Sequence, residues 1–114
     1  MLYLLVEGAE LACDHGGATT IERAGQALVR IEGKRVLVRD DPKGEKIRGC
    51  PNVGATIKPC TITLPETRGD STLVRIERNP VCLDTVEGLT DGTPPGVVKY
   101  RVRRPGQEFV SEES

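Results

Sequence analysis

Residues 73–82 read Leu73-Val74-Arg75-Ile76-Glu77-Arg78-Asn79-Pro80-Val81-Cys82, and this stretch decides the fold class. Its first half alternates apolar, mostly β-branched side chains with charged ones, which is typical of a half-buried β-strand. Arg78-Asn79-Pro80 then breaks the alternation with turn-forming residues. The stretch therefore predicts two short strands joined by a turn.

The same pattern recurs along the chain, at 28–32, 35–39, 61–64 and 97–102. Gly and Pro together number 21 (13 + 8) and divide the chain into short pieces. No stretch keeps a helical period, although residues 21–26 form a candidate short helix. The sequence predicts an all-β fold of short strands and hairpins.

Five residues of the opening stretch occur twice in the sequence. Residues 28–32 (LVRIE) are repeated at 73–77, an offset of 45 (73 − 28), and at the same offset Leu37 matches Cys82. Upstream, Cys13 lies near the position equivalent to Cys60. Each half reads as a cysteine, a loop and a hairpin, and two similar β-units predict a pseudo-symmetric fold.

Length and composition limit the core. The chain has 114 residues, 37% of them apolar, and only three are aromatic. A single domain over 1–106 is expected, followed by a polar tail over 107–114 that we expect to fray. A small core built from aliphatic side chains benefits from a metal or a disulfide as an additional constraint.

Charge and hydropathy exclude several classes of function. The net charge of −1 gives no support for nucleic-acid binding through a basic surface. No apolar run approaches the roughly 18 residues of a membrane span. The apolar start at 1–7 is too short for a signal peptide. The sequence thus predicts synthesis in the cytoplasm, where reducing conditions favour metal ligation over disulfides.

Four side chains form a candidate metal site. Cys13 and His15 are two residues apart, so both point to one face of an extended strand. Cys50 and Cys60 bracket a Pro- and Gly-containing loop that can bring its ends together. Three thiolates and one imidazole are a preferred tetrahedral set for Zn²⁺, with iron as the less favoured ion. A site filled by four protein ligands is structural rather than catalytic.

Other roles for these residues stay open from the sequence alone. The cysteines could be small buried hydrophobes, or a Cys13–Cys60 or Cys50–Cys60 disulfide could form under oxidising conditions. Cys82, at the position of Leu37 in the first hairpin, is expected in the core. The single His is assigned to the metal, which leaves no His free for the proton shuttling that acid–base catalysis usually needs, and we expect no enzyme activity.

Four segments carry a family resemblance. They are Leu11-Ala12-Cys13-Asp14-His15-Gly16-Gly17, Ile47-Arg48-Gly49-Cys50-Pro51, Lys58-Pro59-Cys60-Thr61 and Asn79-Pro80-Val81-Cys82. Together they resemble the PAAR-like spike-tip proteins of contractile injection systems, which include type VI secretion systems, phage tails and extracellular injection particles. The resemblance covers about residues 5 to 103. Classical members use a more His-rich ligand set, so this chain is similar to a divergent branch.

The resemblance implies a small β-rich pyramid that caps a trimeric β-helical spike and carries a metal near its vertex. The ligands would be Cys13, His15, Cys50 and Cys60, and the partner a trimeric spike protein of the valine-glycine repeat type. One copy would sit on each spike, contact a target membrane briefly on injection, and be delivered outside or into a target cell. We expect the hairpins at 28–40 and 73–85 and the strand at 97–103 to contact the spike.

Two further hypotheses compete with the spike tip. The chain could be a stand-alone zinc-stabilised protein-binding module in the cytosol. It could also be a small metal-dependent hydrolase, which would need an open coordination position.

Overall fold

The computed structural model describes residues 2–52, 54–94, 96–107 and 109–112. Within this part of the chain there are nine strands and no helix: β1 (Leu2–Tyr3), β2 (Ala9–Cys13), β3 (Ala18–Ile21), β4 (Arg30–Ile31), β5 (Lys34–Arg35), β6 (Thr63–Ile76), β7 (Asn79–Thr90), β8 (Lys99–Arg104) and β9 (Ser111–Glu112). The predicted all-β class is confirmed. The candidate helix over residues 21–26 is not formed.

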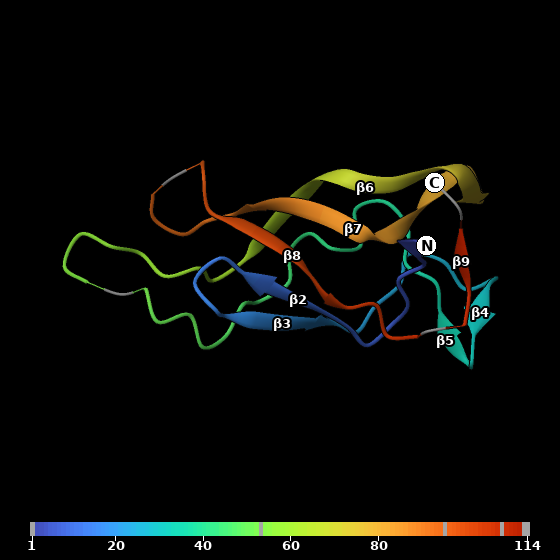
Figure 1. Cartoon of the computed structure of the whole chain (residues 1–114), viewed down its shortest axis with the longest axis horizontal. Helices are drawn as coiled ribbons and strands as arrows, with labels where there is room; N and C mark the ends of the chain where they lie inside the picture. The colour runs from blue at the N-terminus through green and yellow to red at the C-terminus, as the bar shows by residue number, and fades with distance from the viewer. Residues whose placement is uncertain (1, 53, 95, 108, 113–114) are drawn as a thin grey trace.

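A five-stranded antiparallel sheet runs along the molecule, which measures 45 × 24 × 23 Å (Figure 1). Its strand order is β3-β2-β8-β7-β6. β6 and β7 form a hairpin of 14 and 12 residues, longer than the short strands that the sequence predicts. β8 pairs on both sides, with β2 and β7, so a spike strand cannot add to its edges at Tyr100 and Arg101. The expected contact of residues 97–103 with a spike stays a prediction.

The β4–β5 hairpin and the two-stranded β1–β9 sheet lie at the same end of the molecule as the β6–β7 turn (Figure 1). β4 pairs with β5 in the register Arg30↔Arg35, and β6 pairs with β7 in the equivalent register Arg75↔Pro80. The two turns are also alike, because Glu32 and Glu77 both have φ 52°. The predicted internal repeat is therefore present in the backbone, with an unchanged offset of 45.

A third unit with similar strand pairing is built from the two ends of the chain, without a connecting turn. β9 pairs with β1 in the register Ser111↔Tyr3, so the two strands are neighbours although they are far apart in sequence. The side-chain oxygen of Gln107 accepts the backbone N–H groups of residues 109 and 110. Gln26 accepts those of residues 28 and 29, and Ser71 those of residues 73 and 74, in the same way. The polar tail expected over 107–114 is thus corrected for residues 107 and 109–112, which belong to the fold.

The three units close into a ring of hydrogen bonds. The N–H of Leu5 donates to the carbonyl of Cys82, that of Cys82 to Leu37, and that of Leu37 to Leu5, each at 2.9 Å. Isolated bridges repeat the pattern one residue to either side: Leu4↔Leu83, Val6↔Val36 and Val38↔Val81. Each unit contacts the next in the same way, so the part of the molecule that contains the three units has pseudo-three-fold symmetry.

The ring separates two hydrophobic cores. Leu5, Leu37 and Cys82 point into one core, where they pack with the fully buried Tyr100. Their neighbours in sequence point to the other side, as successive residues of a strand must, and form the second core: Leu4, Val6, Val36, Val38, Val81 and Leu83, joined by Ile31 and Ile76. The predicted core position of Cys82 is confirmed, with no exposed surface.

Gln107 should contribute measurably to stability. Its amide nitrogen donates to the carbonyls of Leu4 and Val110, both at 2.8 Å, and only 5% of the residue is exposed. Replacing it with Ala leaves buried backbone groups unpaired, which costs about 1–3 kcal/mol. We expect Gln107→Ala to lower the free energy of unfolding in urea by that amount.

Gln26→Ala provides the matched comparison, because Gln26 makes the equivalent contacts in the first unit. Ala27→Ser is the negative control, because Ala27 is exposed, and it should leave the free energy of unfolding unchanged. A Gln107→Ala variant as stable as the parent chain would mean that residues 107 and 109–112 do not pack as the third unit.

Candidate metal centre

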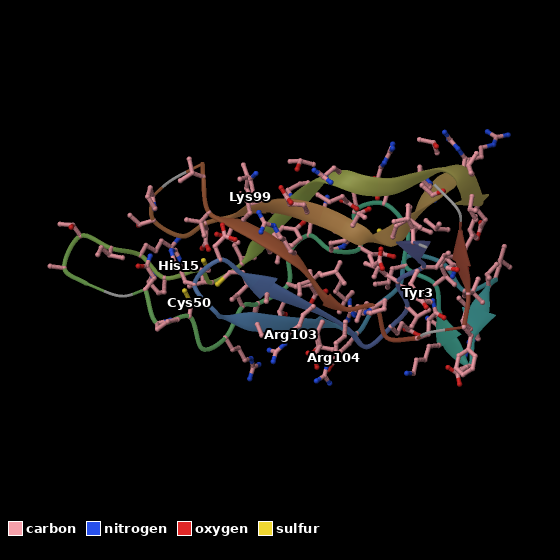
Figure 2. The ribbon with its side chains drawn as sticks, in the orientation of Figure 1. Tyr3, His15, Cys50, Lys99, Arg103 and Arg104 are labelled. Carbon is pink, nitrogen blue, oxygen red and sulfur yellow. The ribbon has the colours of Figure 1, made fainter. Side chains whose placement is uncertain are left out.

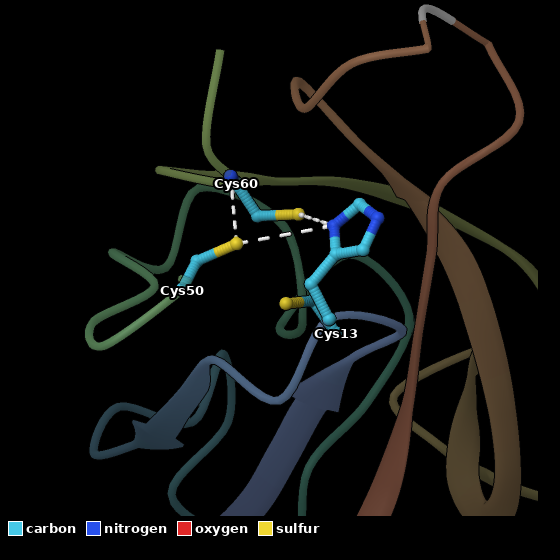
Figure 3. A group of neighbouring side chains, drawn as sticks. Cys13, Cys50 and Cys60 are labelled. Atoms are coloured by element: carbon cyan, nitrogen blue, oxygen red, sulfur yellow. Dashed lines mark hydrogen bonds between the residues drawn. The ribbon is translucent and has the colours of Figure 1, made fainter. Parts of the chain in front are cut away.

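Four ligand-type side chains meet towards the end of the molecule opposite to β4, β5 and β9 (Figures 1 and 2). Cys13 is the last residue of β2, His15 lies in the turn to β3, and Cys50 and Cys60 flank the loop between them. One donor atom of each lies within 4.8 Å of the other three (Figure 3). The structure thus brings together all four residues that the sequence predicts.

The turn after β2 positions Cys13 and His15. The N–H of Cys13 donates to the carbonyl of Gly17 at 2.8 Å, and the N–H of Gly16 donates back to Cys13 at 3.0 Å. A Cβ on Gly17 would lie 2.8 Å from Ile47 Cγ2, closer than Cβ atoms approach other atoms, and would make a tight contact of 3.1 Å with Cys13 Sγ. The second glycine of the CxHGG segment is therefore required by the close approach of the turn to the cluster.

Asp91 and Thr93 hold the loop that carries Cys50 and Cys60. The Asp91 carboxylate accepts the N–H groups of Thr61 and Ile62 and pairs with Lys58 at 2.9 Å. These partners lower the pKa of Asp91 although its partial burial opposes the shift. Thr93 Oγ1 accepts the N–H of Lys58, and its N–H donates to the Lys58 carbonyl. Sequence reasoning missed both residues, because their partners lie about 30 positions away.

Each of the three cysteine sulfur atoms accepts a hydrogen bond from a nearby donor. The N–H of Gly17 lies 3.2 Å from Cys13 Sγ, and the N–H of Cys60 lies 3.3 Å from Cys50 Sγ. The Thr90 hydroxyl lies 3.3 Å from Cys60 Sγ. Donors aimed at sulfur stabilise a thiolate, the form of cysteine that binds a metal.

The two loop cysteines differ in their own acidity. Burial opposes ionisation of Cys50, but backbone N–H groups of Asn52 and Cys60 outweigh it and lower the pKa of this thiol. Burial raises the pKa of Cys60 to about 12. A thiol with so high a pKa stays protonated near neutral pH unless a cation stabilises its thiolate.

The distances suit a shared ion. His15 Nδ1 lies 3.9 Å from Cys50 Sγ and 3.7 Å from Cys60 Sγ. A tetrahedron with metal–ligand bonds of about 2.0–2.3 Å has edges of roughly 3.5–3.8 Å. All the cysteines are free thiols, so no disulfide occupies the cluster. The donor set and the donors behind it fit the group: Cys13, His15, Cys50 and Cys60 could bind one metal ion.

Asp14 has a different role from its neighbours. Its carboxylate accepts the N–H of Lys99 at 3.0 Å, and its own N–H donates to the Lys99 carbonyl at 2.9 Å. These contacts fasten the turn to β8 and do not involve a ligand of the cluster.

A second polar group, Glu66, Asp70 and Cys82, lies beside the ring. Cys82 Sγ is 3.5 Å from a Glu66 oxygen and 3.6 Å from an Asp70 oxygen, and the thiol donates to the Val38 carbonyl at 3.2 Å. Glu66 also accepts the N–H of Asp40. Burial, together with the charge of Asp70, raises the pKa of Glu66 to about 7.

A comparison with protein-family models, with curated proteins and with solved structures finds no match to this chain. In the described part of the chain, no helix has the length and apolar character needed to cross a membrane.

Removing a ligand should remove the metal. We expect elemental analysis to find about one metal ion per purified chain, as one tetrahedral site requires. Cys13→Ser and Cys60→Ser should each lose the ion and unfold at lower urea concentration, since metal binding contributes to folding. Cys82→Ala is the matched control, because Cys82 is buried outside the cluster. Equal metal content in all variants would contradict the ligand assignment.

Glu66 should make stability depend on pH. Its pKa is raised to about 7 in the folded chain, above the value of about 4.3 for an unperturbed Glu. The folded state therefore binds more protons between these values, and its stability falls as pH rises through them. Gln mimics the protonated acid, so Glu66→Gln should be more stable than the parent chain at pH 8.

The difference between Glu66→Gln and the parent chain should shrink at pH 5. Urea unfolding at both pH values measures it, and Glu22→Gln, at an exposed position, is the control. A Glu66→Gln variant that is less stable than the parent at pH 8 would contradict the expected ionisation.

Proposed function

We propose that this chain is the tip of a trimeric β-helical spike in a contractile injection system, as its resemblance to PAAR-like proteins implies. The observation that carries the proposal is the pseudo-three-fold ring formed by Leu5, Leu37 and Cys82. One chain that presents three similar units around one axis can make three similar contacts with a homotrimer. A single chain could then cap the spike without a symmetry mismatch.

The ends of the molecule support this arrangement. The three hairpins lie at one end, and the candidate metal cluster lies towards the other (Figures 1 and 2). In this proposal the hairpin end faces the spike and the cluster faces the target. We propose that the hairpins at 28–40 and 73–85 contact the spike, as the sequence predicts. The β1–β9 strand pair makes the third contact in place of residues 97–103.

A bound metal ion would stabilise the part of the tip around the ligands, where the hydrophobic core is small. The apolar cluster around the ligands is small and contains, besides the cysteines, Ile47 and Val98. An ion that joins residue 13 to residue 60 ties together segments that a core of this size holds weakly. We assign Zn²⁺, because three thiolates and one imidazole match its soft tetrahedral preference.

The proposed role is structural and not enzymatic. Four protein ligands leave Zn²⁺ no open position for water or substrate. In this proposal, one copy made in the cytoplasm joins each spike during assembly. It then contacts the target membrane as the spike enters.

The stoichiometry of the complex tests the proposal. We would express this chain with each valine-glycine repeat spike protein of its source organism and measure the complex mass by light scattering. We expect one chain of 12.3 kDa on three spike subunits. The same spike without its final β-helical turns is the control and should not bind.

Binding of three chains to one trimer would contradict the proposal, since each chain would then use one site instead of three. Absence of binding to every trimeric spike would favour the stand-alone zinc module. Sheath, tube and spike genes beside the gene for this chain would support the spike tip.

A further inference from the structure

Three large apolar side chains are exposed at equivalent positions of the three units. Leu28 is 72% exposed, Leu73 is 73% exposed and Phe109 is 74% exposed. Leu28 lies two residues before β4, Phe109 lies two residues before β9, and Leu73 lies three residues before the end of β6. The pseudo-three-fold relation that places the hairpins around one axis therefore also places these side chains around it.

The backbone at each position is fixed by a buried polar side chain. Gln26 Oε1 accepts the N–H of Leu28 at 2.6 Å, and Ser71 Oγ accepts that of Leu73 at 3.0 Å. Gln107 Oε1 accepts the N–H of Phe109 at 2.7 Å. Each exposed side chain is thus presented from an ordered backbone, which lowers the entropy cost of binding a partner.

The fold itself gains little from these apolar groups. Both hydrophobic cores are closed without them, and most of each side chain faces water. Single exposed apolar residues are common, but here all three equivalent positions carry one, and the largest is aromatic. Apolar and aromatic anchors at the centre of small contact patches are typical of binding surfaces.

Arginines accompany two of the three positions. Arg30 and Arg75 are exposed and follow Leu28 and Leu73 by two residues, so each lies close to its leucine along the chain. Arg30 donates to the Gly33 carbonyl, and among the described residues neither arginine forms an ion pair. The third unit has Ser111 at this position. A complementary partner surface would offer carboxylates beside its apolar sites.

We propose that the partner of this end is a homotrimer with three equivalent apolar sockets, each rimmed by acidic side chains, and that Leu28, Leu73 and Phe109 fill them. This inference rests on the proposed function and adds the residues and the chemistry of the contact. Arg30 and Arg75 pair with two of the acidic rims. The third socket binds the larger Phe109 and has no arginine beside it, so one of the three contacts with the trimer differs from the other two.

Affinity measurements on the folded chain test the anchors. Leu28→Ser, Leu73→Ser and Phe109→Ser would be measured singly and together by biolayer interferometry against the trimeric spike proteins of the source organism. Val97→Ser is the matched control, because Val97 is 58% exposed but lies outside the three hairpins. Retained metal content and an unchanged urea midpoint would show that each variant is folded.

We expect each single variant to bind roughly tenfold or more weakly and the triple variant to lose detectable binding, with Val97→Ser unchanged. Arg30→Gln with Arg75→Gln should slow association and reduce its dependence on salt. If the parent chain binds a spike and the triple variant binds it equally well, the anchors are wrong and the proposed function stands. If the parent chain binds no trimeric spike, the proposed function fails and the anchors fail with it.

Discussion

A ring of three backbone hydrogen bonds, donated in turn by Leu5, Cys82 and Leu37, is the constraint on which the rest of the structure depends. Each bond joins two different units, so no unit can leave without breaking two of them. The ring also sorts the side chains, because its residues face one core and their neighbours face the other. Three hairpins of different length, one of them made from both chain ends, are thereby held in equivalent positions.

The candidate metal centre is the second constraint, and it acts on the turn and the loop that carry its four ligands. Around the ligands the chain consists largely of loops, and the apolar cluster there is small. Cys13 and His15 come from one turn, while Cys50 and Cys60 come from the two ends of a long loop. Asp91 and Thr93 then fasten that loop to the β7–β8 connection. The small core, the ion site and these polar contacts together replace the larger core that a chain of this composition cannot build.

Much of this was predictable from local pattern. Alternation predicted the strands, the LVRIE repeat predicted two equivalent hairpins, and the CxHGG segment with Cys50 and Cys60 predicted the ligand group. The third unit was missed because it shares only an outline with the others: Gln107, Phe109 and Val110 match Gln26, Leu28 and Val29, but the hairpin turn is replaced by the chain ends. Alternation over residues 97–102 did not reveal that β8 is a central strand, because central and edge strands can both alternate.

The sequence by itself determined the all-β class, the repeat and the set of residues able to bind a metal, because each depends on residue type and short spacing. Only the tertiary structure decided that the two ends of the chain pair, that three units close around one axis, and that Leu28, Leu73 and Phe109 become equivalent. Ring closure joins residues 32, 45 and 77 positions apart (37 − 5, 82 − 37 and 82 − 5), and the chain ends pair across 108 and 110 positions (111 − 3 and 112 − 2), all through backbone groups that every residue carries. Such groups leave no mark in the sequence, so the symmetry appears only once the chain has folded.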